Sequence, residues 1–250
     1  MLDIIFITLF PLELKQFFEK GIIKRAVNSK KIQLNFINLR NFGIGNYKAV
    51  DDVPFGGKGG MLLRADVISD ALNSIQGLDS YDIVYPCPKG SVFNQEKSRV
   101  FLSKGKIIFL IGYYEGVDDR IFDLFPIQKI SIGDFVLNSG ETASLAIAET
   151  IIRQYPGVLG NPECINNDSI SCGVLEHPQY TQPQELQNFK VPDILRSGHH
   201  KKIVDWKRHQ ALKSTLYKRP DLLIKEELNT HDKAELTQFI REKYGEIDHE

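Results

Sequence analysis

The sequence predicts an α/β fold, with a mostly parallel sheet covered by helices on both faces and a small helical domain after it. Three observations lead to this prediction. Short runs rich in Ile, Val and Phe alternate with amphipathic stretches through the first 160 residues. After Pro156 the chain becomes rich in Gly, Pro, Asn, Asp and Ser, and helical patterns without good strands then follow. Alternation of strands and helices favours a parallel sheet that is buried on both faces.

Five apolar runs predict the strands, because each is short, rich in β-branched and aromatic residues, and bounded by turn residues. They are DIIFITLF at 3–10, IQLNFINL at 32–39, YDIVYPC at 81–87, KIIFLIGYY at 106–114 and KISIGDFVL at 129–137.

Four stretches between the strands have helical periodicity, at 12–27, 61–75, 94–102 and 141–155. The last of them directs its apolar residues towards the core: Leu145, Ile147, Ala148, Ile151 and Ile152. We therefore predict an α/β domain over 1–160, a flexible linker over 161–175 and a helical domain over 176–250.

Composition points to a soluble protein of the reducing cytoplasm. The chain is 42% hydrophobic and 25% charged, which is ordinary for a globular protein. It has no apolar run of about 18 residues, and its N-terminus is typical of a core strand, not of a signal peptide. The three cysteines, Cys87, Cys164 and Cys172, lack C-x-x-C spacing, which disfavours structural zinc and a disulfide framework.

Basic residues gather in two blocks although the net charge is only −1. Eight basic residues and one acid lie between Lys15 and Lys48, and seven basic residues and one acid lie between Lys201 and Arg219. Such blocks suggest a polyanion that docks on particular faces, and two ordinary solvated helices are the alternative.

Two phosphate-binding motifs are missing. In PFGGKGGM (54–61), Lys58 is followed by Gly59 where a P-loop needs Ser or Thr. No G-x-G-x-x-G follows the first predicted strand, which disfavours a dinucleotide. The glycine-rich segment itself is compatible with ligand contact or with a simple turn.

Three loops with glycine, proline and small polar residues follow predicted strands: YPCPKG at 85–90, GYYEGVDDR at 112–120 and GDFVLNSGE at 133–141. Ligands of open α/β sheets bind outside the carboxyl ends of strands. The third loop contains no basic residue, so we expect an adenine-bearing ligand without phosphates. Simple tight turns between strand and helix are the alternative.

Arg153 and Asp168 form a further pair of candidates, although each also has a structural explanation. A cation is favoured at a helix C-terminus, and Asp commonly makes a turn. The six histidines are scattered, and no metalloprotease or Ser–His–Asp pattern accompanies them.

Seven ordered motifs resemble the bacterial tRNA (guanine-N1)-methyltransferase family of the SPOUT superfamily: YPCPKG, GYYEGVDDR, SIGDFVLNSGE, PGVLG, NDS, PQYTQP and SGHH with a following Trp. The resemblance covers nearly the whole chain, from LFP at 9–11 to RPDLL at 219–223.

The resemblance implies a SPOUT-type parallel sheet whose chain threads a deep trefoil knot, an exception to the rule that chains are unknotted. It also implies a homodimer with active sites at its interface, S-adenosylmethionine as methyl donor, and transfer to N1 of the guanine just 3′ of the anticodon. The helical domain would bind tRNA. The family also depends on magnesium, for which the sequence has no recognisable ligand spacing.

Carried over residue by residue, the resemblance assigns the cofactor pocket to Tyr85, Pro86, Cys87, Pro88, Gly112, Ile132, Gly133, Phe135, Leu137, Ser139 and Gly140. Glu115 would lie near the cofactor and the target base, and Arg153 and Asp168 would be the catalytic pair. Guanine N1 must lose a proton, for which a carboxylate such as Asp168 can serve as general base. The guanidinium of Arg153 would stabilise the charge that develops on O6.

Five positions depart from the family pattern. Lys58 and Gly59 replace Gly-Pro, Gln182 replaces Arg, Phe135 replaces a frequent Tyr and Ala143 a frequent Pro. Gln182 removes a candidate phosphate contact. The alternatives are a non-catalytic RNA-binding relative, which the retained Glu115, Arg153 and Asp168 disfavour, and a nucleotide-processing enzyme unrelated to RNA, which the basic blocks and missing phosphate loops disfavour.

Overall fold

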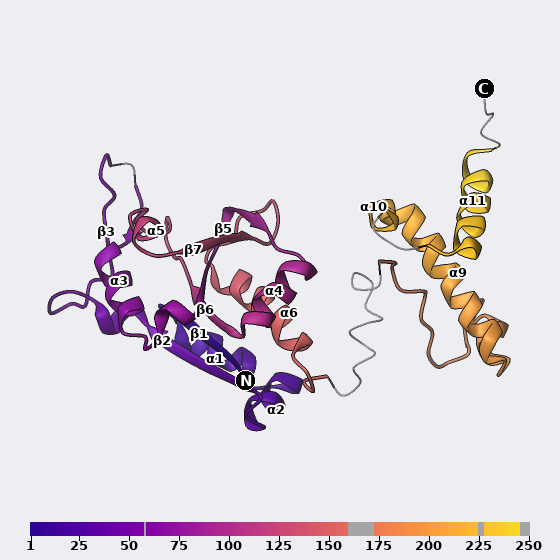
Figure 1. Cartoon of the computed structure of the whole chain (residues 1–250), viewed down its shortest axis with the longest axis horizontal. Helices are drawn as coiled ribbons and strands as arrows, with labels where there is room; N and C mark the ends of the chain where they lie inside the picture. Colours follow the sequence, from indigo (N-terminus) through magenta and orange to yellow (C-terminus); the bar gives the residue numbers. More distant parts are fainter. Residues whose placement is uncertain (58, 160–172, 225–227, 246–250) are drawn as a thin grey trace. The chain divides into compact units, whose positions relative to one another are not determined.

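The computed structural model describes residues 1–57, 59–159, 173–224 and 228–245 (Figure 1). The chain divides into two compact units, Met1–Asn161 and Pro162–Glu250. The predicted linker at 161–175 lies almost entirely outside the described residues.

The first unit is built on a five-stranded sheet in the order β2-β1-β6-β5-β7, and every pairing in it is parallel. The strands are β1 (Leu2–Thr8), β2 (Ile32–Asn38), β5 (Asp82–Val92), β6 (Lys106–Leu110) and β7 (Ile127–Ser131). The predicted parallel sheet is therefore confirmed. The register of β5 against β7 shifts between Pro86 and Ser91, where the strand bulges.

Helices cover both faces of this sheet, as the alternating pattern predicts. They are α1 (Pro11–Phe18), α2 (Gly21–Asn28), α3 (Ala65–Asn73), α4 (Gln95–Lys104), α5 (Ile121–Leu124) and α6 (Glu141–Gln154), with 3₁₀ turns η1 (Leu39–Phe42) and η2 (Leu78–Ser80). Figure 1 shows α3 and α5 on one side of the sheet and α4 and α6 on the other.

Two hydrophobic clusters fill the space between the sheet and its helices. Successive side chains of a strand point to opposite faces. Accordingly Ile4 and Phe6 of β1 belong to the cluster under α4 and α6, whereas Ile5 and Ile7 belong to the cluster under α3 and α5. The predicted inward face of α6 is confirmed, since Ile147, Ala148, Ile151 and Ile152 are fully buried and the fifth residue, Leu145, is partly buried against the same cluster.

Several of the predicted elements are wrong in their extent. The strand at 81–87 continues to Val92, the strand at 106–114 ends at Leu110, and the helix at 61–75 begins only at Ala65. The stretch at 12–27 is two helices, because Gly21 adopts a left-handed φ of +64° that ends the regular α-helical path between α1 and α2. The last strand ends at Ser131 and not at 137, because the backbone turns at Gly133, whose φ is +148°.

The glycine-rich segment forms the tip of a small antiparallel hairpin between β3 (Asp51–Asp52) and β4 (Leu62–Leu63). Gly56, Gly57, Gly59 and Gly60 all have positive φ values. The segment is therefore a turn that depends on glycine.

The second unit is mainly helical. It contains α8 (Asp193–Arg196), α9 (His200–Lys218), α10 (Pro220–Leu223) and α11 (Thr230–Tyr244), together with a short hairpin of β8 (Glu185–Leu186) and β9 (Phe189–Lys190) that the sequence did not predict. Its core joins Val174, Ala211, Leu212, Leu236 and Phe239. In the described part of the chain, no helix is long and apolar enough to cross a membrane.

Candidate functional site

A cavity of about 280 Å³ lies at the carboxyl ends of β5, β6 and β7. Its walls come from the bulge of β5 and from the loops after β6 and β7, which are the three loops singled out in the sequence. Eleven predicted pocket residues line it together: Tyr85, Pro86, Cys87, Pro88, Gly112, Ile132, Gly133, Phe135, Leu137, Ser139 and Gly140. Glu115 lines the same cavity.

The side chain of Tyr85 needs a glycine at position 112. A Cβ atom on Gly112 would lie 2.6 Å from Tyr85 Oη, closer than real Cβ contacts. Burial, with smaller effects of Cys87 and Asp119, raises the pKa of Tyr85 to about 12. The hydroxyl is therefore neutral at physiological pH and keeps its proton for hydrogen bonding.

Hydrogen bonds fix the loop after β7 in place. Ser131 Oγ donates to the carbonyl of Gly133 over 3.1 Å, where the strand ends. At the other end of the loop, Gly140 N donates to the carbonyl of Gly112 over 3.1 Å. The loops after β6 and β7 are thus joined, and α6 begins at the cavity with Glu141.

Glu115 carries the only charged side chain among the described residues that line the cavity. The remaining lining is apolar, aromatic, glycine or small polar. A carboxylate without a neighbouring Lys or Arg in the lining favours a neutral or positively charged ligand and disfavours a phosphate.

The cavity also has lining residues that no motif assigned individually, among them Tyr113, Tyr114, Asn138 and Ala143. Tyr113, Tyr114 and Asn138 lie inside the strand-end loops singled out in the sequence. Their position in these loops is the sequence feature that could have predicted them. Tyr114 has a left-handed φ of +58°, which is unusual for a bulky residue and is typical of functional loops.

Arg153 is not brought to this cavity within one chain, since it is absent from the lining. It lies in the last turn of α6, whereas the cavity lies at the first turn. Twelve residues of helix separate Glu141 from Arg153, which corresponds to about 18 Å. Asp168, the other half of the predicted pair, lies outside the described residues.

The described residues contain no group of three or more His, Cys, Asp or Glu side chains that could hold a metal ion. Cys87 is a free thiol in the cavity lining, whereas Cys164 and Cys172 lie outside the described residues. His199 and His200 are exposed at the start of α9.

A partly buried hydrogen bond holds the start of α6 on the end of β1. Thr8 is fully buried, and its hydroxyl donates to Glu141 Oε1 over 2.8 Å while accepting a bond from Phe10 N over 3.0 Å. Glu141 Oε2 is also buried, with no partner among the described residues. The carboxylate therefore depends on Thr8.

We expect Thr8→Val to lower the free energy of unfolding by about 1–3 kcal/mol, because it leaves a buried carboxylate without its donor. Urea denaturation measures this change. Thr142→Val is the matched control, since Thr142 is exposed in the same first turn of α6 and its loss should change stability by less than about 0.5 kcal/mol. Equal effects of the two variants would contradict the role given to Thr8.

The fold and the cavity define an α/β protein whose strand-end loops enclose a cavity of the size of a small ligand. A family model described as tRNA (Guanine-1)-methyltransferase TrmD matches residues 2–225, and the chain belongs to this family. Proteins named tRNA (guanine-N(1)-)-methyltransferase are similar to it over nearly their whole length. That of Sulfurihydrogenibium sp. is 42% identical (97% of this chain, 95% of that protein). That of Staphylococcus carnosus is 40% identical (95% and 97%), and that of Dictyoglomus turgidum 39% (99% and 100%).

Proposed function

We propose that this chain transfers a methyl group from S-adenosylmethionine to N1 of guanosine 37, just 3′ of the anticodon in tRNA. The observation that carries the proposal is the meeting of all eleven predicted pocket residues around one cavity, in whose described lining Glu115 is the only charged side chain. Membership of the methyltransferase family and relatives named for guanine N1 support the reaction type and the tRNA substrate.

S-adenosylmethionine fits the chemistry of this cavity. It carries adenosine without phosphates and a positive sulfonium, which supplies the methyl group. The glycines of the three loops leave backbone N–H and C=O groups open to the heterocycle. The carboxylate of Glu115 would attract the cation.

The reaction requires the protein to perform three further tasks. Asp168 accepts the N1 proton as the methyl group bonds to N1, so that the guanine does not become cationic. Arg153 donates hydrogen bonds to O6, where negative charge gathers as the proton leaves. The walls of the cavity align the methyl group with N1. The described residues offer no cluster of magnesium ligands, and no step is assigned to that ion.

A homodimer would assemble these groups. Within one chain Arg153 lies about 18 Å along α6 from the cavity, too far to touch a base bound there. A second copy can bring its own Arg153 to the cavity, because a two-fold dimer places matching surfaces against each other. The separation supports the predicted dimer with active sites at its interface. The trefoil knot, a tRNA-binding role for the second unit and a cytoplasmic location belong to the same proposal.

The proposal is tested by transfer of a labelled methyl group to unmodified tRNA. We expect incorporation into tRNA with guanosine at position 37 and none into tRNA with adenosine there. Equal incorporation into both would contradict the proposed target.

A further prediction tests whether the cavity binds the methyl donor. Gly112→Ala should weaken binding of S-adenosylmethionine by about 5- to 150-fold, because the new methyl group meets the buried Tyr85 ring and overpacking costs about 1–3 kcal/mol. Isothermal titration calorimetry measures the Kd. Gly45→Ala is the control, because Gly45 does not line the cavity and open space surrounds it. Its left-handed φ of +68° disfavours a side chain, so stability should fall while the Kd stays unchanged. An unchanged Kd for Gly112→Ala would place the donor elsewhere.

A further inference from the structure

The β3–β4 hairpin presents an aromatic side chain to solvent. Phe55 is 100% exposed at its tip, so the side chain gains nothing from burial within the unit. A single exposed Phe is common in proteins and needs no explanation by itself. Phe55, however, also forms part of the wall of a second cavity.

This second cavity has a volume of about 720 Å³, within the range of ligand sites, and shares no lining residue with the first. One part of its wall is apolar: Val53, Pro54, Phe55, Leu62, Ala65 and Leu124. The other part is polar: Asp52, Arg64, Asp66, Ser69, Asp118 and Arg120. Leu63 completes the lining.

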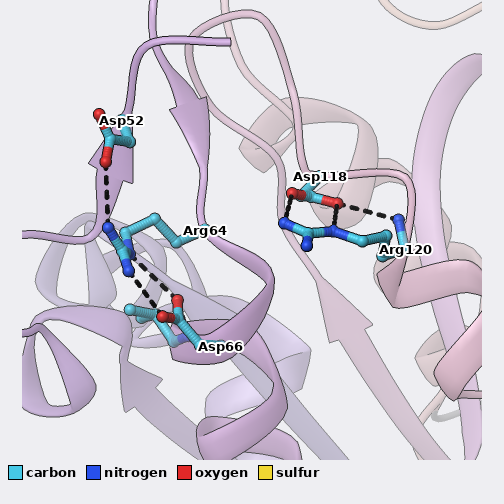
Figure 2. Close-up of polar contacts among 6 residues, drawn as sticks. Asp52, Arg64, Asp66, Asp118 and Arg120 are labelled. Carbon is cyan, nitrogen blue, oxygen red and sulfur yellow. Dashed lines mark hydrogen bonds and ion pairs between the residues drawn. The ribbon is translucent and has the colours of Figure 1, made fainter. Parts of the chain in front are cut away.

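Ion pairs neutralise the charges of the polar wall (Figure 2). Arg64 lies between Asp52, at 3.1 Å, and Asp66, at 2.7 Å. Arg120 binds Asp118 with both Nε and Nη2, at 2.9 and 2.6 Å. These contacts lower the pKa of Asp66 and that of Asp118, so both carboxylates stay ionised.

The charges of the wall disfavour a phosphate as its ligand. Three carboxylates outnumber two guanidinium groups, and the cavity therefore has no positive excess. Fixed donors and acceptors beside an apolar and aromatic wall instead match the edge and face of a nucleobase.

The hairpin is bonded to the loop that lines the first cavity. Glu115 N donates to the carbonyl of Met61 over 3.1 Å, and Leu63 N donates to that of Gly116 over 3.0 Å. A Cβ on Gly60 would lie 2.5 Å from Glu115 Cγ, so the two segments touch there. Phe55 is five residues from Gly60 and lies within about 18 Å of it.

We infer that the second cavity holds an unpaired nucleobase of the tRNA, a few nucleotides at most from the target guanosine, with its face stacked on Phe55. The inference rests on the proposed function, which brings the anticodon loop to the first cavity. Proteins read RNA loops by binding splayed bases on aromatic side chains. The cavity would thereby help to position the target and to select the sequence around it.

The test is the affinity of Phe55→Ala for unmodified tRNA. Because stacking of one base on an aromatic side chain is worth a factor of about 5 to 150, the Kd and the KM for tRNA should rise by that factor. Phe55→Trp should restore them. The slope of affinity against salt should not change, since no charge is removed. The Kd for S-adenosylmethionine should be that of the wild type.

Tyr47→Ala is the matched control, because Tyr47 is 96% exposed and does not line the second cavity. It should leave the affinity for tRNA unchanged. To identify which base stacks on Phe55, tRNAs are prepared that carry 2-aminopurine at single unpaired positions of the anticodon loop. Fluorescence at one position should fall on binding to the wild type and not on binding to Phe55→Ala.

Unchanged tRNA affinity in Phe55→Ala, with a wild type that methylates tRNA, would overturn the inference and leave the proposed function standing. Equal losses in Phe55→Ala and Tyr47→Ala would also overturn it. A wild type that binds tRNA without methylating it would instead contradict the proposed function.

Discussion

Asp168→Asn should lower kcat by about 10²- to 10⁴-fold, the range that a positioned general base contributes. Asparagine has nearly the same shape as aspartate but cannot accept the N1 proton. The Kd for S-adenosylmethionine should stay that of the wild type, because no cavity contact is assigned to Asp168. Single-turnover methyl transfer with saturating tRNA and donor measures the chemical step.

The pH dependence of the rate distinguishes a general base from a residue that only shapes the site. The wild-type rate should fall at low pH as the carboxylate becomes protonated, and this fall should be absent in Asp168→Asn. Glu163→Gln is the matched control, because Glu163 is an acidic residue five positions earlier in the sequence to which no role in proton transfer is assigned. Its rate and pH profile should be those of the wild type. Normal turnover by Asp168→Asn would remove Asp168 from the role of base.

Arg153→Ala should lower kcat by about 10²- to 10³-fold, because a preorganised donor to developing negative charge is worth that much. Arg153→Lys should recover only part of the rate, since lysine keeps the charge and loses the planar fork. Thermal unfolding of both variants checks that α6 is intact.

The dimer adds a sharper prediction for this residue. Gly112→Val, which blocks the cavity, and Arg153→Ala should each be inactive alone. If Arg153 acts on the partner's cavity, a mixed dimer has one site with both lesions and one site with none. Co-expression in equal amounts should then restore about one quarter of wild-type activity, as two-fold symmetry requires. No recovery in a sample shown to contain mixed dimers would mean that Arg153 acts within its own chain.

The sheet and the first cavity could be predicted because both follow from local pattern. Apolar runs of strand length identify β1, β2, β5, β6 and β7, and parallel strands bring their carboxyl ends to one edge. Residues as far apart as Tyr85 and Gly140 could therefore be expected in one place. The lack of basic residues in the loop after β7 predicted a ligand without phosphates, and the described lining of the cavity contains no Lys or Arg.

Other features depend on contacts that no local pattern records. The break between α1 and α2 depends on the backbone angle φ of Gly21, and the continuous amphipathic pattern at 12–27 does not indicate it. The second cavity joins 52–69 to 118–124, and these segments meet only when the hairpin folds against the loop after β6, although each ion pair of the wall lies within one segment. The distance of Arg153 from the first cavity, by contrast, follows from the length of α6, which the helical pattern at 141–155 already predicts.

The most direct test of the proposed function is the identity and position of the methylated nucleoside. Unmodified tRNA is incubated with the protein and S-adenosylmethionine, digested to fragments and to nucleosides, and examined by mass spectrometry beside a synthetic standard. The proposal predicts 1-methylguanosine at position 37 and at no other position. A methyl group on another atom or nucleotide, or no methylation by a folded protein that binds both substrates, would contradict it.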